Sequence, residues 1–141
     1  MNITYSISKT LPSEAKYIRQ KVFVDEQGFV EEFDEDDNKA IHVVMYIDGL
    51  AIGTTRIIFS DLHNMFVIGR VAILKEYRKK GLGRLLMGKT EEVLINEYGH
   101  NLIGVSSQER VSGFYHSLGY EYTSEKYLDQ DCPHVFMNKQ L

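Results

Sequence analysis

One stretch in the middle of the sequence constrains the fold more than any other. Residues 65–74 are almost continuously apolar, which is typical of a strand buried on both faces. A basic turn follows, and a long helix is predicted from about Gly83 to Tyr98, closed by Gly99. Leu102–Val105 then indicates another strand. A strand, a helix and a strand in this order require a right-handed crossover and parallel pairing, so the sequence predicts an α/β fold.

Antiparallel hairpins are expected on both sides of this unit. Residues 40–47 and 51–59 have strand character, and Asp48-Gly49 between them is a strong two-residue hairpin signal. The sequence further predicts a first strand, two helices and a last pair of strands, at residues 3–7, 12–28, 110–118, 120–127 and 134–138. The expected architecture is a mixed central sheet flanked by helices.

Length, composition and charge limit the number of domains, the location and the class of partner that can be expected. The 141 residues are 43% apolar and 26% charged, which is ordinary globular usage, and this length predicts one domain over residues 1–141. No window approaches about 18 consecutive apolar residues, so no membrane span is expected. The net charge of −4 argues against a nucleic-acid binder. A single cysteine, Cys132, and no evident signal peptide favour a reducing, cytoplasmic location. The oligomeric state, including a homodimer, stays open.

The turn after the apolar stretch has the features of a phosphate-binding site. It carries four cations and two glycines: Arg78, Lys79, Lys80, Arg84, Gly81 and Gly83. Glycines let the backbone approach a ligand closely, and the free N–H groups and dipole of the new helix favour an anion. This combination suits a diphosphate. The alternative is a solvated basic turn with a glycine-assisted helix start.

Two other phosphate motifs fail on context. Gly83–Thr90 satisfies the letters G-x-x-x-x-G-K-[ST] of a P-loop, but no strand directly precedes it and its middle residues belong to the predicted helix. The dinucleotide pattern G-x-G-x-x-G breaks because Leu86 stands where the third glycine belongs. A P-loop nucleotide binder is therefore a distant alternative.

Two motifs carry a resemblance to a known family. Arg78–Gly83 matches [QR]-x-x-G-x-[GA], and Phe114–Tyr120 matches F-Y-x-x-x-G-[FY]. The sequence resembles the GNAT superfamily of acetyl-CoA-dependent N-acetyltransferases, and it is similar to the ElaA-like branch of that family. The similarity to this branch lies in residues 19–27, 34–42, 69–72 and 132–137. Cys132 and Phe29 depart from the pattern of the branch.

The resemblance implies a GNAT-like sheet with its parallel strand pair around acetyl-CoA, which serves as acetyl donor. No C-x-x-C or H-x-x-x-H spacing occurs in the sequence, so no metal site is expected. The backbone of residues 71–73 is expected to pair with the pantetheine arm. Residues 79–84 are expected to hold the pyrophosphate, and Gln108 to lie beside the cofactor. The implied cofactor-binding residues are Val71, Ala72, Ile73, Arg78, Lys79, Lys80, Gly81, Leu82, Gly83, Arg84 and Gln108.

Removing a proton from the amine costs more free energy than stabilising the departing thiolate. An amine with a pKa of ~10.4 is neutral only about 0.04% of the time at pH 7, which is a handicap of about 4.6 kcal/mol. The resemblance makes Tyr115 the candidate that assists the departing thiolate; otherwise it is a packed aromatic. Glu26 is the first candidate for the base, with a water relay or His134 as alternatives, and the structural alternative for Glu26 is a surface position on its helix. The expected acceptor contacts are Phe23, Glu26, His42 and His134.

The predicted function is direct transfer of acetyl to a primary amine of a small molecule or peptide. The acidic block Glu31–Asp37 either attracts a cationic amine or is simply solvated. His42 is either a border of the acceptor pocket or a structural hydrogen-bonding residue. Cys132 is a conceivable covalent nucleophile. The competing class is a non-catalytic acyl-CoA-binding or sensing module.

Overall fold

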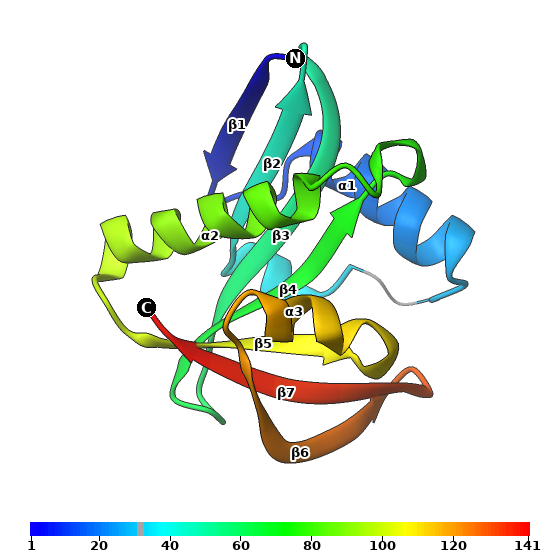
Figure 1. The fold of residues 1–141 in the computed structure, drawn as a ribbon. Coiled ribbons are helices and arrows are strands. Elements are labelled where there is room, and N and C mark those ends of the chain that lie inside the picture. Colours follow the sequence, from blue (N-terminus) through cyan, green and yellow to red (C-terminus); the bar gives the residue numbers. More distant parts are fainter. Residues whose placement is uncertain (31–32) are drawn as a thin grey trace.

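The protein is described by a computed structural model in which residues 1–30 and 33–141 are placed. Seven strands form one mixed sheet in the order β1-β2-β3-β4-β5-β7-β6 (Figure 1). The strands are β1 (Ile3–Ser8), β2 (Ile41–Ile47), β3 (Leu50–Ser60), β4 (Met65–Ile73), β5 (Leu102–Gln108), β6 (Glu121–Asp129) and β7 (Cys132–Gln140). The α-helices are α1 (Ser13–Arg19), α2 (Leu82–Tyr98) and α3 (Ser112–Ser117).

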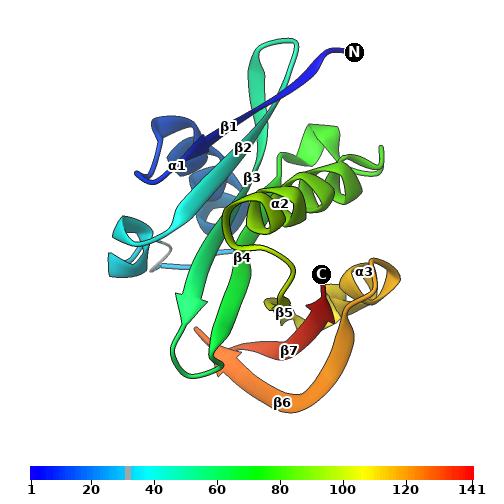
Figure 2. The ribbon, with the colours of Figure 1, turned by 90° about the vertical axis from the view of Figure 1, so that its left-hand side faces the viewer.

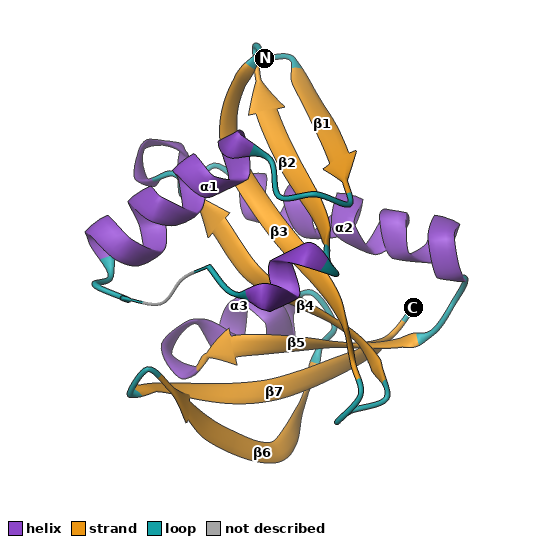
Figure 3. Cartoon of the chain, turned by 180° about the vertical axis from the view of Figure 1, so that it is seen from behind, coloured by secondary structure: helices purple, strands orange, loops and turns teal. Residues whose placement is uncertain are grey.

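The helices cover opposite faces of the sheet. α2 and α3 lie on the face seen in Figure 1, whereas α1 lies on the face seen from behind in Figure 3. Strands β2, β3 and β4 pass between α1 and α2 in the side view (Figure 2). α1 continues directly into a π-helix, Gln20–Glu26, where the sequence predicted one uninterrupted α-helix. The predicted single domain with a mixed sheet is confirmed.

Because successive side chains of a strand point to opposite faces, the sheet has one apolar cluster on each face. In β2, Val43 and Met45 pack in a large cluster beneath α2, while Val44 packs in a smaller cluster beneath α1. Ile18 and Phe23 bring the α1 segment into the smaller cluster. Residues of a strand point alternately to the two faces, so one strand serves both cores.

The parallel pair predicted from the sequence is present, but it is short. β4 pairs with β5 only through Phe66–Ile68 and Ile103–Val105. Beyond these residues β4 keeps its antiparallel partner β3, with a bulge that places Arg70 at a φ of 50°. The strands β4 and β5 therefore diverge toward their carboxyl ends. In this half β4 is only partly buried, although Val71 and Ile73 pack against the cluster beneath α2 and Ala72 packs in the cluster beneath α1, so the prediction of burial on both faces holds in part. Its free edge borders a cavity.

Gly104 lies in this short pair and has no room for a side chain. A Cβ at this position would overlap the ring of Phe136, and that ring is already stacked on His63 with 3.8 Å between centroids. We expect Gly104→Ala to lower the free energy of unfolding by about 1–3 kcal/mol, the usual effect of overpacking. Urea unfolding measures it. Gly88→Ala is the control, because nothing lies within 4 Å of that Cβ and alanine favours the helix. Equal stability of Gly104→Ala and wild type would contradict the clash.

Candidate active site

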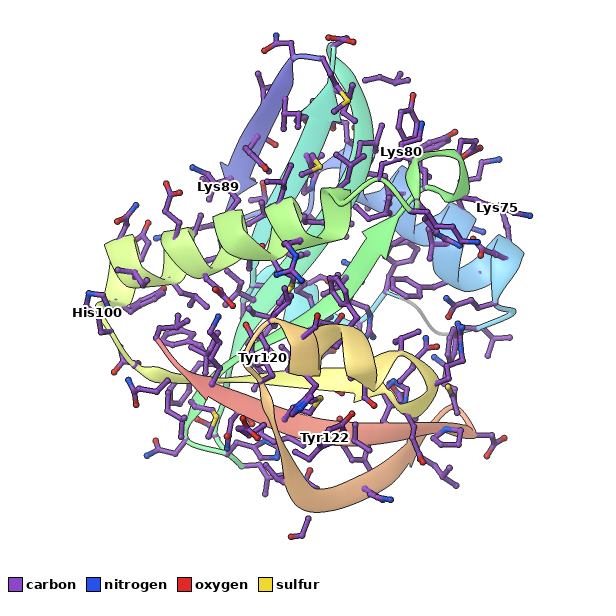
Figure 4. The ribbon with its side chains drawn as sticks, viewed as in Figure 1. Lys75, Lys80, Lys89, His100, Tyr120 and Tyr122 are labelled. Carbon is purple, nitrogen blue, oxygen red and sulfur yellow. The ribbon has the colours of Figure 1, made fainter. Side chains whose placement is uncertain are left out.

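The turn between β4 and α2 forms a pocket of backbone donors. Lys79 and Gly81 have left-handed φ angles of 64° and 76°, and α2 begins at Leu82 without a side-chain cap. Within the described ranges, no residue accepts a hydrogen bond from the N–H groups of residues 79–84. Lys75 and Lys80 extend from the same turn (Figure 4). Free donors at a helix start together with nearby cations make this turn suited to a phosphate group.

A cavity of about 480 Å³ occupies the space where β4 and β5 diverge. Residues from both faces of the sheet line it, among them Phe23 from the α1 side and Tyr115 from α3. An adjoining cavity of about 680 Å³ shares Gln27, Phe29 and Gln108 with it. The Nε2 of Gln108 donates to the Oε1 of Gln27 over 2.7 Å, which joins β5 to the end of the π-helix. The split in the sheet is therefore accessible to a ligand from both faces.

Tyr115 projects its phenol into this space. Its side chain is only 7% exposed, and burial raises the pKa of Tyr115 above its ordinary value of 10.0. Its hydroxyl has no hydrogen-bond partner among the residues described. A protonated phenol with an unused donor at a cavity wall can stabilise negative charge that develops there.

Glu26 is held by an arginine of the turn. The guanidinium of Arg78 donates to both carboxylate oxygens over 2.6 and 2.8 Å, and its Nε donates to the carbonyl oxygen of Ile73 over 2.9 Å. The hydrogen bond from Arg78 lowers the pKa of Glu26. Both contacts weaken the carboxylate as a proton acceptor. The assignment of Glu26 as the base stays a prediction, and these contacts argue against it.

His42 lies away from the cavity. It is buried at the start of β2, and its Nε2 is 2.9 Å from the carbonyl oxygen of Asp37. Burial lowers the pKa of His42, which favours the neutral ring. It does not belong to the lining of either cavity, so its contact with the acceptor stays a prediction that the structure does not favour. Its buried, hydrogen-bonded position agrees with the alternative that His42 is a structural residue.

The sequence analysis missed a cluster of buried charges next to the acceptor side. Arg19, only 1% exposed, donates to both carboxylate oxygens of Asp37 over 2.8 and 3.2 Å. Arg56 lies 3.2 Å from Asp37 and 2.7 Å from Asp34. A signal was available, because Arg19 occupies the apolar stripe of its helix, four residues after Ala15.

The ion pairs of this cluster involve carboxylates of the acidic block Glu31–Asp37 and so bear on its predicted role. Glu31 and Glu32 lie outside the described residues. Of the others, Asp34 and Asp37 are paired with arginines, and Glu35 and Asp36 are exposed. The two paired carboxylates contribute little net field, so a role for the block in attracting a cationic amine has weak support.

Most residues expected to contact cofactor or acceptor gather at the two cavities and the turn. The first cavity is lined by Phe23, Val71, Ala72, Ile73, Arg78, Gln108, Tyr115 and His134. Glu26 borders the adjoining cavity. Leu82 contributes a free N–H to the turn, while its side chain is buried under the sheet. The letters of the P-loop, Gly83–Thr90, lie inside α2 and form no loop.

Residues 1–30 and 33–141 contain neither a cluster of metal-ligand side chains nor a membrane-spanning helix. No three His, Cys, Asp or Glu side chains in these ranges converge as metal ligands would. No helix in them is both long and apolar enough to cross a membrane.

Comparison with known proteins identifies the family of this fold. The family model of the acetyltransferase (GNAT) domain matches residues 10–141, which include the turn, the split and Tyr115. The chain belongs to the GNAT acetyltransferase family. Membership of this family makes it an acyltransferase. YyaT of Bacillus subtilis is 34% identical and aligns over 100% of this chain and 97% of its own length.

Solved structures agree with this assignment. The crystal structure of Escherichia coli ElaA superposes with a TM-score of 0.85 at 26% identity, covering 98% of this chain and 99% of ElaA. The resemblance to the ElaA-like branch is thereby confirmed. A GNAT family acetyltransferase from Elizabethkingia anophelis, crystallised with acetyl-CoA bound, shares the fold with a TM-score of 0.73 at 14% identity, over 99% of both chains.

Proposed function

We propose that this GNAT protein transfers the acetyl group of acetyl-CoA directly to a primary amine. The observation that carries the proposal is the divergence of β4 and β5 next to the free N–H groups of residues 79–84. An unpaired strand edge offers backbone groups to an amide-containing arm, and the helix start offers donors to a diphosphate. Coenzyme A contains both groups. Its presence in the Elizabethkingia relative supports this choice of donor.

The site residues divide between holding the donor and assisting the leaving group. The turn would hold the diphosphate, and the edge of β4 beside Val71 would align the arm. Acetyl-CoA supplies a thioester whose carbon an amine can attack. The Tyr115 hydroxyl would donate a hydrogen bond to the sulfur as negative charge develops on it. Cys132 borders only the adjoining cavity, so direct transfer is favoured over an acyl-enzyme.

Release of free thiol tests the proposal. Purified protein is mixed with acetyl-CoA and a panel of amines that includes small alkylamines, polyamines, amino sugars and a peptide with a free amino terminus. We expect thiol release that depends on one class of amine, and calorimetric binding of coenzyme A. Binding of coenzyme A without thiol release for any amine would contradict acetyl transfer and favour an acyl-CoA-binding module. Absence of binding would contradict the cofactor assignment itself.

A further inference from the structure

Three strands carry a row of polar side chains on the sheet face opposite α2. Val135 and Met137 of β7 pack in the cluster beneath α2, so alternation directs His134 to the other face. His134 pairs in register with Gln108 of β5 and with Tyr127 of β6. This face is the one that α1 covers, and it is the side of the split opposite Tyr115. The row therefore lies where an acceptor amine would approach.

The hydrogen bonding of His134 determines which of its nitrogens is basic. Its Nδ1 lies 2.9 Å from the carbonyl oxygen of Cys132. A carbonyl oxygen only accepts, so Nδ1 carries the hydrogen and Nε2 of the neutral ring keeps its lone pair. The side chain lines the cavity, is only 8% exposed, and stacks on the ring of Tyr127 with 5.7 Å between centroids. Its Nε2 has no hydrogen-bond partner in the described part of the chain.

A carboxylate lies beside this imidazole. Asp129 is opposite Cys132 in the β6–β7 register, while Tyr127 is opposite His134, so Asp129 and His134 are diagonal neighbours on one face. Asp129 also lines the cavity, and no described residue forms an ion pair with it. A carboxylate attracts an ammonium group but is too weak a base to deprotonate it efficiently. An imidazole is better suited to take the proton near neutral pH.

We propose that His134 Nε2 is the general base for the acceptor amine and that Asp129 holds the ammonium group before it loses its proton. The proposal rests on the proposed acetyl transfer and adds the proton acceptor to it. Of the described residues that line the cavity, His134 is the one with an unpartnered basic nitrogen. Glu26, the other candidate, has both oxygens occupied by Arg78.

The ammonium gives one proton to Nε2 and becomes a neutral amine. The nitrogen attacks the thioester carbon, a carbon–nitrogen bond forms, and the carbon–sulfur bond breaks with its electron pair on sulfur. The second nitrogen proton finally neutralises the thiolate, and the imidazolium returns its proton to solvent. The products are the amide, coenzyme A and one proton.

The tautomer is tested without any acceptor. Long-range ¹H–¹⁵N spectra of the histidine side chains, assigned with the variant His134→Asn, report which nitrogen carries the hydrogen in the neutral ring. We expect hydrogen on Nδ1 of His134. Hydrogen on Nε2 would overturn the proposal, because the lone pair would then face the Cys132 carbonyl and not the cavity.

The catalytic role is tested with two acceptors that differ in basicity. One is a primary alkylamine that is active in the panel, and the other is its 2,2-difluoro analogue, which is neutral in a far larger fraction at the same pH. The variant His134→Asn keeps a donor near the position of Nδ1 and removes Nε2. We expect its kcat/KM to fall by about 100-fold or more with the alkylamine, within the usual range for loss of a general base. The loss with the difluoro analogue should be much smaller.

Controls separate the base from a structural role and from the proposed function. His100→Gln removes an exposed histidine at the end of α2 and should retain wild-type rates (Figure 4). Calorimetry should give unchanged binding of coenzyme A to His134→Asn. Equal losses with both acceptors would mean that His134 is structural and would overturn the proposal. An acceptor-dependent loss in Glu26→Gln, and none in His134→Asn, would assign the base to Glu26. Wild-type protein that binds coenzyme A but acetylates no amine would refute the transfer itself.

Discussion

Replacement of Tyr115 by phenylalanine should lower kcat by about 100-fold, while the affinity for coenzyme A changes less than about threefold. The substitution keeps the buried ring and its edge-to-face contact with Tyr120, whose centroid is 6.1 Å away. It removes only the hydroxyl that faces the cavity. A loss confined to turnover is the expected signature of an interaction made in the transition state and not in the ground state.

Steady-state kinetics of thiol release together with calorimetry of coenzyme A measure these two quantities. Tyr122→Phe is the matched control, because its hydroxyl contacts the Ser112 hydroxyl at 3.0 Å and lines neither cavity. Figure 4 shows Tyr122 on β6, below α3. Burial raises the pKa of Tyr115, so the wild-type profile should show no tyrosine ionisation below pH 10. Unchanged kcat in Tyr115→Phe over a pH series would refute the role.

The second large effect concerns stability. We expect Asp37→Asn to lower the free energy of unfolding by about 3 kcal/mol or more, because it removes the carboxylate that Arg19 and Arg56 share in the interior. Asp37 is only 3% exposed, so water cannot replace the lost partner. Urea unfolding measures the change. Asp36→Asn, at an exposed neighbour, should change stability by less than about 0.5 kcal/mol.

The same carboxylate predicts a dependence of stability on acid. Burial raises the pKa of Asp37, but the hydrogen bonds from Arg19 and the backbone of Asp34 outweigh it and lower the pKa from 3.8 to about 2. The folded protein thus binds this proton less readily than the unfolded chain does. The contribution is fully present above about pH 4 and is lost as the pH falls toward 2. A wild-type acid-unfolding curve identical to that of Asp37→Asn would contradict this coupling.

The parts of the fold that local patterns control were predictable. The apolar run of β4, the basic turn and the helix α2 are consecutive in sequence, and each has its own signal of hydrophobicity, glycine or capping. Asp48-Gly49 specifies its hairpin in the same local way. The motif residues of the turn and Tyr115 are recognisable from the sequence, and in the structure Arg78 and Tyr115 line the same cavity.

The remaining features depend on contacts between distant residues. Glu26 and Arg78 are 52 positions apart, and nothing near either residue indicates that they pair. The π-helix at Gln20–Glu26 also has no clear local signature. For His42 the sequence left a structural role and a place at the acceptor pocket open, and only its contact with Asp37 shows it buried at the start of β2. Side chains whose electrostatics depend on a partner elsewhere in the chain are therefore the ones whose predicted roles changed or stay untested.

The narrow seam between β4 and β5 has a consequence for how this enzyme can diversify. Under the proposed function, the turn and the edge of β4 hold the donor, and both belong to the part of the chain that ends with α2, whereas Tyr115, Asp129 and His134 come from the last third of the chain. Among the described residues, the strand pairing between these two portions consists of three residue pairs. Under the same proposal, substitutions at Asp129 and its neighbours on β6 and β7 alter which nucleophile is accepted while the turn and the β4 edge that hold the donor are unchanged, an arrangement that directed evolution of new acceptors could exploit.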